Sequence, residues 1–269
     1  MFFSRLFSVP KPGGKIRPII DLKALNKLLK VPKFRMETLD KIAKCLWEVL
    51  WATSVDITDA YWHVPIDPEF QIYFAFALGS RIFVFLVVPF GLSPAPWAFS
   101  RILKPVKARL RSQNVVVFSY LDDFLVLGSS PQRALSNMQK TVDLLVSLGF
   151  GINWGKSSVT PAQRVEFLGV VLDLQELTFS LPPDKVSKVL QWRKEVLQAS
   201  TMSRRELEAL VGFLNFVGSF IPLGRLYLLP IRLFSGNRTA IACLSRLGSL
   251  GAPLLWQLSK EILGFCLHS

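Results

Sequence analysis

The 269-residue sequence has few acidic residues, few cysteines and few histidines. Asp and Glu number 19 against 32 Lys and Arg, so the formal net charge is +13. The three cysteines, Cys45, Cys243 and Cys266, are odd in number and far apart, so they fit neither a disulfide framework nor a zinc site. This cysteine usage predicts a protein of a reducing, intracellular environment.

Long apolar runs are also absent. The longest uncharged stretch that could span a membrane, residues 209–224, contains Asn215 and Ser219 and is interrupted by Pro222. It is shorter than the roughly 20 apolar residues that a spanning helix needs. The apolar residues at the start of the chain are too few for a signal peptide. We therefore expect no membrane partner.

Hydrophobic residues make up 51% of the chain and charged residues 19%, which predicts an ordered core over most of the length. The length suits one large domain or two modest ones. Residues 1–50 contain 11 Lys and Arg against 4 Asp and Glu, and residues 183–269 contain 11 against 5. This uneven basic charge favours a polyanionic partner such as nucleic acid, although a simple solvated surface remains an alternative.

Apolar periodicity and turn residues predict a mixed α+β chain. Helices are expected at 38–50, 94–112, 130–149 and 183–220. Hairpins or strands are expected at 7–22, 51–57, 70–89, 115–120, 124–127 and 165–172. Pro105 is expected to kink the second helix, and Pro182-Pro183 is the expected domain boundary.

Three carboxylates lie in apolar surroundings. Asp122 and Asp123 separate two β-rich runs, and Asp56 lies in a third. Burying a carboxylate is costly without a cation or hydrogen bonds. Carboxylates from neighbouring strands can share two Mg²⁺ or Mn²⁺ ions about 3.5–4 Å apart. Acids that merely cap a hairpin turn fit these residues equally well.

Several segments, taken in order, resemble the motifs of reverse transcriptases. Tyr120-Leu-Asp-Asp123 resembles the Tyr-x-Asp-Asp box, and residues 55–66 resemble the first catalytic motif. The fingers motif, the second catalytic motif, the lysine motif and the primer-grip strand match residues 16–26, 89–99, 149–157 and 166–169. The resemblance covers roughly residues 8–225.

The resemblance implies an α+β right-hand polymerase fold. Residues 1–50 would form partial fingers, and residues 51–182 a palm whose insertion at about 67–112 belongs to the fingers. Residues 183–230 would form a helical thumb, and residues 231–269 a connection remnant or an unrelated tail. The implied function is RNA-directed DNA polymerisation, with dNTPs and a primer on an RNA or DNA template as partners.

The resemblance also implies residue roles. Asp56, Asp122 and Asp123 would hold two Mg²⁺ or Mn²⁺ ions, and Lys156 would donate a proton to the leaving pyrophosphate. The expected dNTP-binding residues are Lys11, Lys15, Arg17, Ile57, Tyr61, Phe90 and Gly91, and the expected primer grip is Phe167, Leu168 and Gly169. Basic residues of 101–111 and 185–205 would contact phosphates.

Each of these residues also has an ordinary structural interpretation. Lys156 could be a solvated lysine, Tyr61 a core aromatic, Arg17 part of an exposed basic turn, and residues 167–169 a plain strand.

The finer likeness is to retrotransposon enzymes. Phe90 stands where retroviral enzymes usually carry Gln, and residues 205–216 look most like DIRS-type, tyrosine-recombinase elements. Fingers structure is expected upstream of the chain, and residues 226–269 lack the acidic residues of a ribonuclease H domain. The alternative function is therefore an inactive nucleic-acid-binding remnant, truncated or co-opted.

Overall fold

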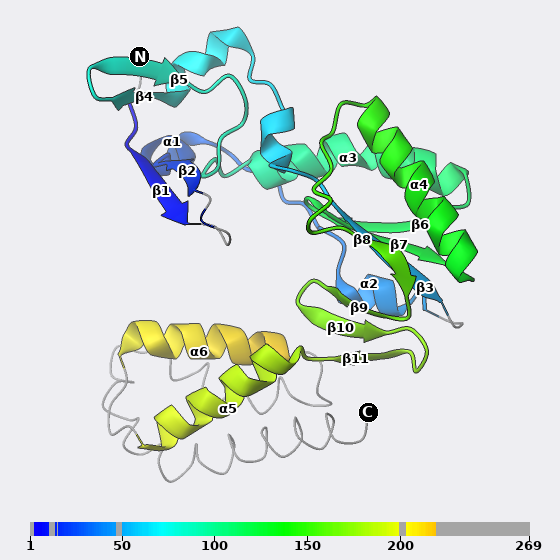
Figure 1. The fold of residues 1–269 in the computed structure, drawn as a ribbon. Helices are drawn as coiled ribbons and strands as arrows, with labels where there is room; N and C mark the ends of the chain where they lie inside the picture. The colour runs from blue at the N-terminus through cyan, green and yellow to red at the C-terminus, as the bar shows by residue number, and fades with distance from the viewer. Residues whose placement is uncertain (1–2, 11–13, 15, 47–49, 199–202, 219–269) are drawn as a thin grey trace. The chain divides into compact units, whose positions relative to one another are not determined.

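The computed structural model describes residues 3–10, 14, 16–46, 50–198 and 203–218. The chain forms two compact units, Met1–Gln163 and Arg164–Ser269, which are considered separately. Both units contain helices and antiparallel sheets (Figure 1), as an α+β chain should. Lys11 and Lys15, and the tail at 231–269, lie outside the described residues.

A four-stranded antiparallel sheet is the centre of the first unit. Its order is β6 (Val116–Tyr120), β7 (Asp123–Gly128), β3 (Trp51–Asp56) and β8 (Ser158–Ala162). Strand β7 is apolar at every position from Phe124 to Leu127, and these side chains are fully buried. Such a run is typical of a strand covered on both faces.

Helices α3 (Ala95–Ser112) and α4 (Pro131–Ser147) pack on this sheet (Figure 1). In α3 the buried side chains recur every three or four residues, at Phe99, Leu103, Val106 and Leu110, and the helix continues through Pro105. Helix α4 begins as predicted, because the Ser130 side chain accepts a hydrogen bond from the N–H of Arg133 (3.1 Å).

The N-terminal part of the first unit is built from short elements. The predicted hairpin is present as β1 (Leu6–Pro10) and β2 (Ile16–Ile20), followed by α1 (Lys23–Leu28). Helix α2 (Leu39–Ala43) is much shorter than predicted. It ends in a turn in which the Cys45 N–H bonds to the Ile42 carbonyl (2.8 Å).

The predicted 70–89 hairpin is also shorter, because local capping competes with the strand. The Asp67 side chain accepts from the Glu69 N–H (3.0 Å) and Pro68 follows it, so Pro68–Phe74 forms the 3₁₀ helix η2. Strands β4 (Ala75–Leu78) and β5 (Arg81–Val84) then pair. Another short 3₁₀ helix, η1 (Ala60–His63), follows β3.

The second unit corrects two predictions. The single strand expected at 165–172 is a hairpin of β9 (Arg164–Phe167) and β10 (Val170–Asp173), with β11 (Thr178–Ser180) beside it. The chain reverses because Leu168 and Gly169 adopt positive φ angles of 52° and 75°.

The helix expected at 183–220 is two helices, α5 (Pro183–Gln198) and α6 (Arg204–Val217). A new helix starts where Ser203 and Glu206 form a capping box, in which each side chain bonds to the other residue's N–H.

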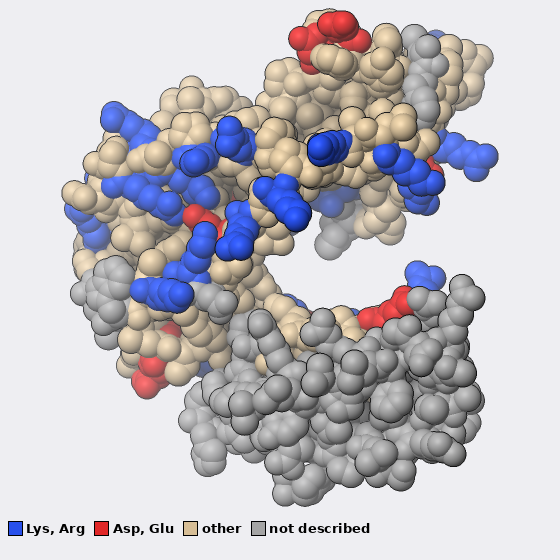
Figure 2. Space-filling view, turned by 180° about the vertical axis from the view of Figure 1, so that it is seen from behind, with Lys and Arg blue, Asp and Glu red and all other residues tan. Residues whose placement is uncertain are grey.

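Lys and Arg side chains gather over the side of the first unit where α2 and α3 lie (Figure 2). Glu37, which pairs with two of these basic side chains, binds to the open edge of strand β6. Its carboxylate accepts the N–H of Ser119 (2.6 Å) and forms ion pairs with Arg111 (2.9 Å) and Lys107 (3.2 Å). Arg111 also donates to the Val117 carbonyl (2.8 Å). Side chains thus satisfy edge groups that a further strand would otherwise pair.

We expect Glu37→Gln to lower the free energy of unfolding at pH 7 by about 2 kcal/mol, because charged hydrogen bonds to Arg111 and Lys107 are lost. Burial raises the pKa of Glu37, but the Ser119 N–H and the two cations outweigh it, so the pKa lies below the ordinary value. A lowered pKa stabilises the fold above the unfolded-state value and this contribution is lost as pH falls. Urea unfolding should therefore show the difference at pH 7 and a much smaller one below about pH 4. An equal difference at both values would contradict the ionic role.

Candidate functional site

The three predicted acids meet at one end of the central sheet. Strands β3 and β7 pair in a register that sets Asp56 opposite Asp123. Asp122 lies in the tight turn before β7, where Leu121 adopts a positive φ of 55°. The Asp122 carbonyl accepts the N–H of Ile57 (2.9 Å), which ties this turn to the end of β3. The sheet therefore gathers acids that are far apart in the sequence.

The pKa values of Asp122 and Asp123 are raised. Burial and then the negative charge of Asp56 raise the pKa of Asp122, against opposing hydrogen bonds and cations. Burial, the charge of Asp122 and the interaction with Asp56 raise the pKa of Asp123 to about 7. The Lys156 ammonium, which is largely exposed, lies 4.0 Å from the Asp56 carboxylate. The cluster thus has an excess of negative charge that a cation would relieve.

The donor chemistry of this cluster fits a hard divalent cation, because all three groups are carboxylates. Within the described residues, however, no three His, Cys, Asp or Glu side chains converge closely enough to hold an ion as they stand. Binding would therefore require the carboxylates to turn toward a common point. The raised pKa values of Asp122 and Asp123 are the observation that favours such an ion.

The predicted lysine motif packs beside Asp56. The Asp56 N–H donates to the Ser157 Oγ (3.0 Å), and the Asp56 carbonyl accepts the N–H of Asn153 (2.8 Å). Ser157 in turn donates to the Asn153 carbonyl (2.9 Å). These bonds explain why Lys156 reaches the acids. The sequence did not predict that Asn153 and Ser157 support the acid cluster, because their partner Asp56 is about a hundred residues away in the chain.

Arg17, Tyr61 and Phe90 form a cluster near the acids. The Arg17 guanidinium lies over the Phe90 ring, 4.4 Å from its centre, and the Tyr61 ring lies 5.4 Å from the same ring. Burial and then the charge of Asp122 raise the pKa of Tyr61 to about 12. The Arg17 Nε is buried and has no hydrogen-bond partner among the described residues. An anionic group beside Arg17 would satisfy that nitrogen.

The backbone at Gly91 has a conformation and a close contact that require glycine. Its φ is 106°, and a Cβ atom there would lie 2.7 Å from the Ile20 carbonyl oxygen. Asn26 fastens the same loop, since it donates to the Gly91 carbonyl (2.8 Å) and accepts the N–H of Ser93 (2.9 Å). The sequence suggested close approach of a ligand at Gly91, whereas the contact found here is with strand β2.

The predicted primer-grip residues lie at the β9–β10 turn of the second unit, where Phe167 is buried and Gly169 has a positive φ. Lys185, from α5, donates to the Gly169 carbonyl (2.6 Å), and its ammonium lies 5.0 Å from the centre of the Phe216 ring of α6. Lys185 was expected to contact phosphates. In the structure its ammonium joins the turn to both helices, a contact that no local sequence pattern signals.

Comparison with known proteins identifies the family of the chain. The family model described as "Reverse transcriptase (RNA-dependent DNA polymerase)" matches residues 9–172. The chain belongs to the reverse transcriptase family. A curated relative, the Transposon Tf2-3 polyprotein of Schizosaccharomyces pombe, is 26% identical over 214 residues, which cover 80% of this chain but only 15% of the relative. The Tf2-4 polyprotein of the same organism matches equally well.

Solved reverse transcriptases share the fold. A foamy viral protease-reverse transcriptase in complex with double-stranded DNA has a TM-score of 0.74 at 19% identity, covering 96% of this chain and 44% of the other. The same viral protein in complex with an RNA/DNA hybrid has a TM-score of 0.70 at 18% identity, covering 96% and 33%. The predicted right-hand polymerase fold is thus confirmed. Among the described helices of this chain, none is both long and apolar enough to cross a membrane.

Proposed function

We propose that this chain is the core of an RNA-directed DNA polymerase, which adds dNTPs to a primer 3′ end on an RNA or DNA template. The observation that carries the proposal is the pairing of Asp56 with Asp123, with Asp122 in the adjoining turn. A divalent cation is the ordinary solution to such crowded carboxylates. Membership of the reverse transcriptase family supports the same reaction.

Asp56, Asp122 and Asp123 would hold two Mg²⁺ or Mn²⁺ ions, with the Ile57 carbonyl as a further ligand. Such ions lower the pKa of the attacking hydroxyl and stabilise the charge on the leaving pyrophosphate. The chain's own contribution is to bring the three carboxylates to one end of β3 and β7. Lys156, 4.0 Å from Asp56, would donate a proton to the pyrophosphate as it leaves.

Arg17 would bind the triphosphate of the incoming nucleotide. Its guanidinium is held over Phe90 and its Nε lacks a partner in the described structure, so a phosphate oxygen is a suitable acceptor. Lys11 and Lys15 would supply further positive charge, and Gly91 would keep this loop close to the nucleotide. The β9–β10 turn at Phe167, Leu168 and Gly169 would support the primer end.

Tyr61 would select dNTPs over rNTPs, because its ring, packed against Phe90 and Phe99, would occupy the space of a 2′-hydroxyl. We expect Tyr61→Val to reduce this selectivity about a hundredfold, as measured by the ratio of kcat/KM for dNTP and rNTP. Tyr61→Phe retains the ring and should retain the selectivity. Equal selectivity in the Val and Phe variants would exclude a steric role for the ring.

A primer-extension assay on homopolymer templates, with Mg²⁺ or Mn²⁺, tests the polymerase function. Extension by dNTPs that stops when EDTA is added is the expected result. Binding of primer–template without extension in either metal would contradict the proposal and favour the alternative, a truncated or co-opted nucleic-acid-binding remnant. The curated relatives are much longer than this chain, which spans 15% of their length, so the assay should also include the surrounding reading frame.

The finer origin is proposed from residues 205–216, whose pattern looks most like that of DIRS-type elements. On this proposal residues 1–50 are partial fingers, 51–182 are palm with the finger insertion at 67–112, and 183–230 are thumb. A tyrosine-recombinase reading frame in the DNA that flanks the gene would support this origin, and an integrase of another class there would contradict it.

A further inference from the structure

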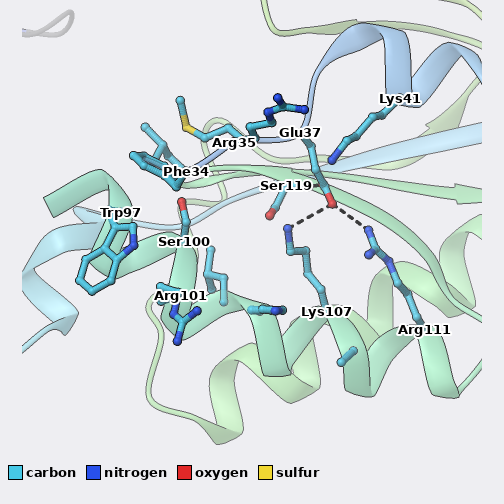
Figure 3. A pocket seen from close by; sticks show the side chains of 15 residues that line it. Phe34, Arg35, Glu37, Lys41, Trp97, Ser100, Arg101, Lys107, Arg111 and Ser119 are labelled. Atoms are coloured by element: carbon cyan, nitrogen blue, oxygen red, sulfur yellow. Dashed lines mark hydrogen bonds and ion pairs between the residues drawn. The ribbon is translucent and has the colours of Figure 1, made fainter. Parts of the chain in front are cut away.

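A cavity of about 480 Å³ lies beside α3, and its lining reaches Leu121, which precedes Asp122 in the chain. Its walls come from α3, from strand β6 and from the segment 34–41 (Figure 3). None of Asp56, Asp122, Asp123, Arg17 and Tyr61 lines it. The side chains of the cavity therefore differ from those of the proposed dNTP site, although the cavity borders the Asp122 turn and both are in the first unit.

The cavity is strongly basic. Six cationic side chains line it, namely Arg35, Lys41, Arg101, Lys104, Lys107 and Arg111. Glu37 is the one carboxylate among its lining residues, and it is already engaged by Lys107, Arg111 and the Ser119 N–H. Within the described structure, no ion pair joins Arg35, Lys41, Arg101 or Lys104 to an acid. Cations crowded in this way repel one another unless an anion lies between them.

Two aromatic rings, Phe34 and Trp97, line the same cavity, and both are half-buried (Figure 3). Aromatic rings next to Lys and Arg are the combination on which single-stranded nucleic acids bind, since bases stack on the rings and phosphates contact the cations. A duplex holds its bases inside its own stack, so it presents only phosphates to such a cavity. The concave shape and the rings therefore favour an unpaired nucleotide.

We propose that this cavity is a second nucleic-acid site, which binds a single-stranded segment by stacking a base on Trp97 or Phe34 and contacting its phosphates with Arg101 and Lys104. The proposal goes beyond the polymerase function, because the site needs neither the acids nor a metal ion. A chain that fails to extend primers could still bind single strands in this cavity. Failure of the polymerase proposal and failure of the single-strand proposal can therefore be distinguished.

The first test measures the binding of a fluorescent oligo(dT) in EDTA, with excess blunt duplex present to occupy sites that accept double strands. We expect Arg101→Ala with Lys104→Ala to weaken binding at least tenfold. The slope of log affinity against log salt should fall by about 1.4, as expected for two lost phosphate contacts to a single strand. The matched control is Lys30→Ala with Arg133→Ala, which removes the same charge from exposed residues outside the cavity. Equal losses in the two double variants would overturn the proposal.

The second test separates stacking from charge. Trp97→Leu retains every cation and should weaken oligo(dT) binding about tenfold, because stacking is lost. Inorganic triphosphate and dTMP serve as competitors. If either competitor displaces the fluorescent oligo(dT) at as low a concentration as unlabelled oligo(dT) does, the cavity is a simple anion site. That result would overturn the single-strand proposal.

Photocrosslinking gives a direct location without relying on variants that fold poorly. An oligonucleotide carrying 5-iodouridine should crosslink to peptides that contain Phe34 or Trp97, as identified by mass spectrometry. Crosslinks confined to peptides around Arg17 or Tyr61 would overturn the proposal, since they would place the strand at the dNTP site.

Discussion

Asp122→Asn should reduce dNTP incorporation about a thousandfold or more while leaving primer–template binding within about twofold. The substitution keeps the size of the side chain and removes a negative charge from the cluster at the end of β3 and β7. The pKa of Asp122 is raised by burial and by Asp56, so an amide costs the metal-free fold little. Loss of extension therefore reports on metal binding and not on unfolding. Single-turnover extension in Mg²⁺ and in Mn²⁺ measures it.

Asp143→Asn is the matched control for this experiment. Asp143 is an exposed acid on α4 that accepts a hydrogen bond from Gln139 (2.8 Å), and an amide oxygen can accept the same bond. We expect full extension by this variant. Wild-type extension by Asp122→Asn, or equal losses in both variants, would show that the acid cluster does not hold the catalytic metals.

Gly128→Ala should lower the free energy of unfolding by about 3 kcal/mol or more. Gly128 ends β7, and the chain turns at once into α4. A Cβ atom at Gly128 would press against the backbone N of Ala134 and lie 2.7 Å from its Cα. These are backbone atoms of a capped helix start, so they cannot move aside as a flexible side chain would. Strand β7 and α4 would have to separate, which disturbs the strand that carries Asp123.

Urea unfolding of Gly128→Ala measures this loss, with Gly155→Ala as the comparison. A Cβ atom at Gly155 meets only the Asn153 side chain, at the ordinary contact distance of 3.7 Å. We expect that variant to lie within about 0.5 kcal/mol of the wild type. Similar stability of the two variants would mean that β7 and α4 are packed less closely than the structure indicates.

Much of the molecule was predictable because its signals are local. The start of α4 depends on Ser130 and Pro131, which are adjacent to the helix that they begin. The apolar run of β7 and the apolar spacing of α3 likewise act within one element. The predictions that failed were those in which a local signal was overlooked, such as the Asp67 cap that turns a predicted strand into a 3₁₀ helix. The Leu168–Gly169 turn is a second example.

The acids show where local signals stop. Their identity and their apolar surroundings were evident from the sequence, and so was their order relative to the other reverse transcriptase motifs. From the acids alone a metal site and a capped hairpin were equally good interpretations. The register that sets Asp56 opposite Asp123, and the rise in pKa that follows, depend on the pairing of strands far apart in the chain.

The sequence by itself therefore determined the family, the acids proposed to hold the metal ions and most helix and strand positions, because these depend on residue identity and short-range periodicity. Only the tertiary structure decided the contacts that support them. Glu37 meets Ser119 across 82 residues, and Ser157 meets Asp56 across 101. Arg17 and Phe90, which are also far apart in the sequence, lie against each other. Side chains so distant in sequence come together only when the sheet and its helices have packed, so no local pattern records which partners they will have.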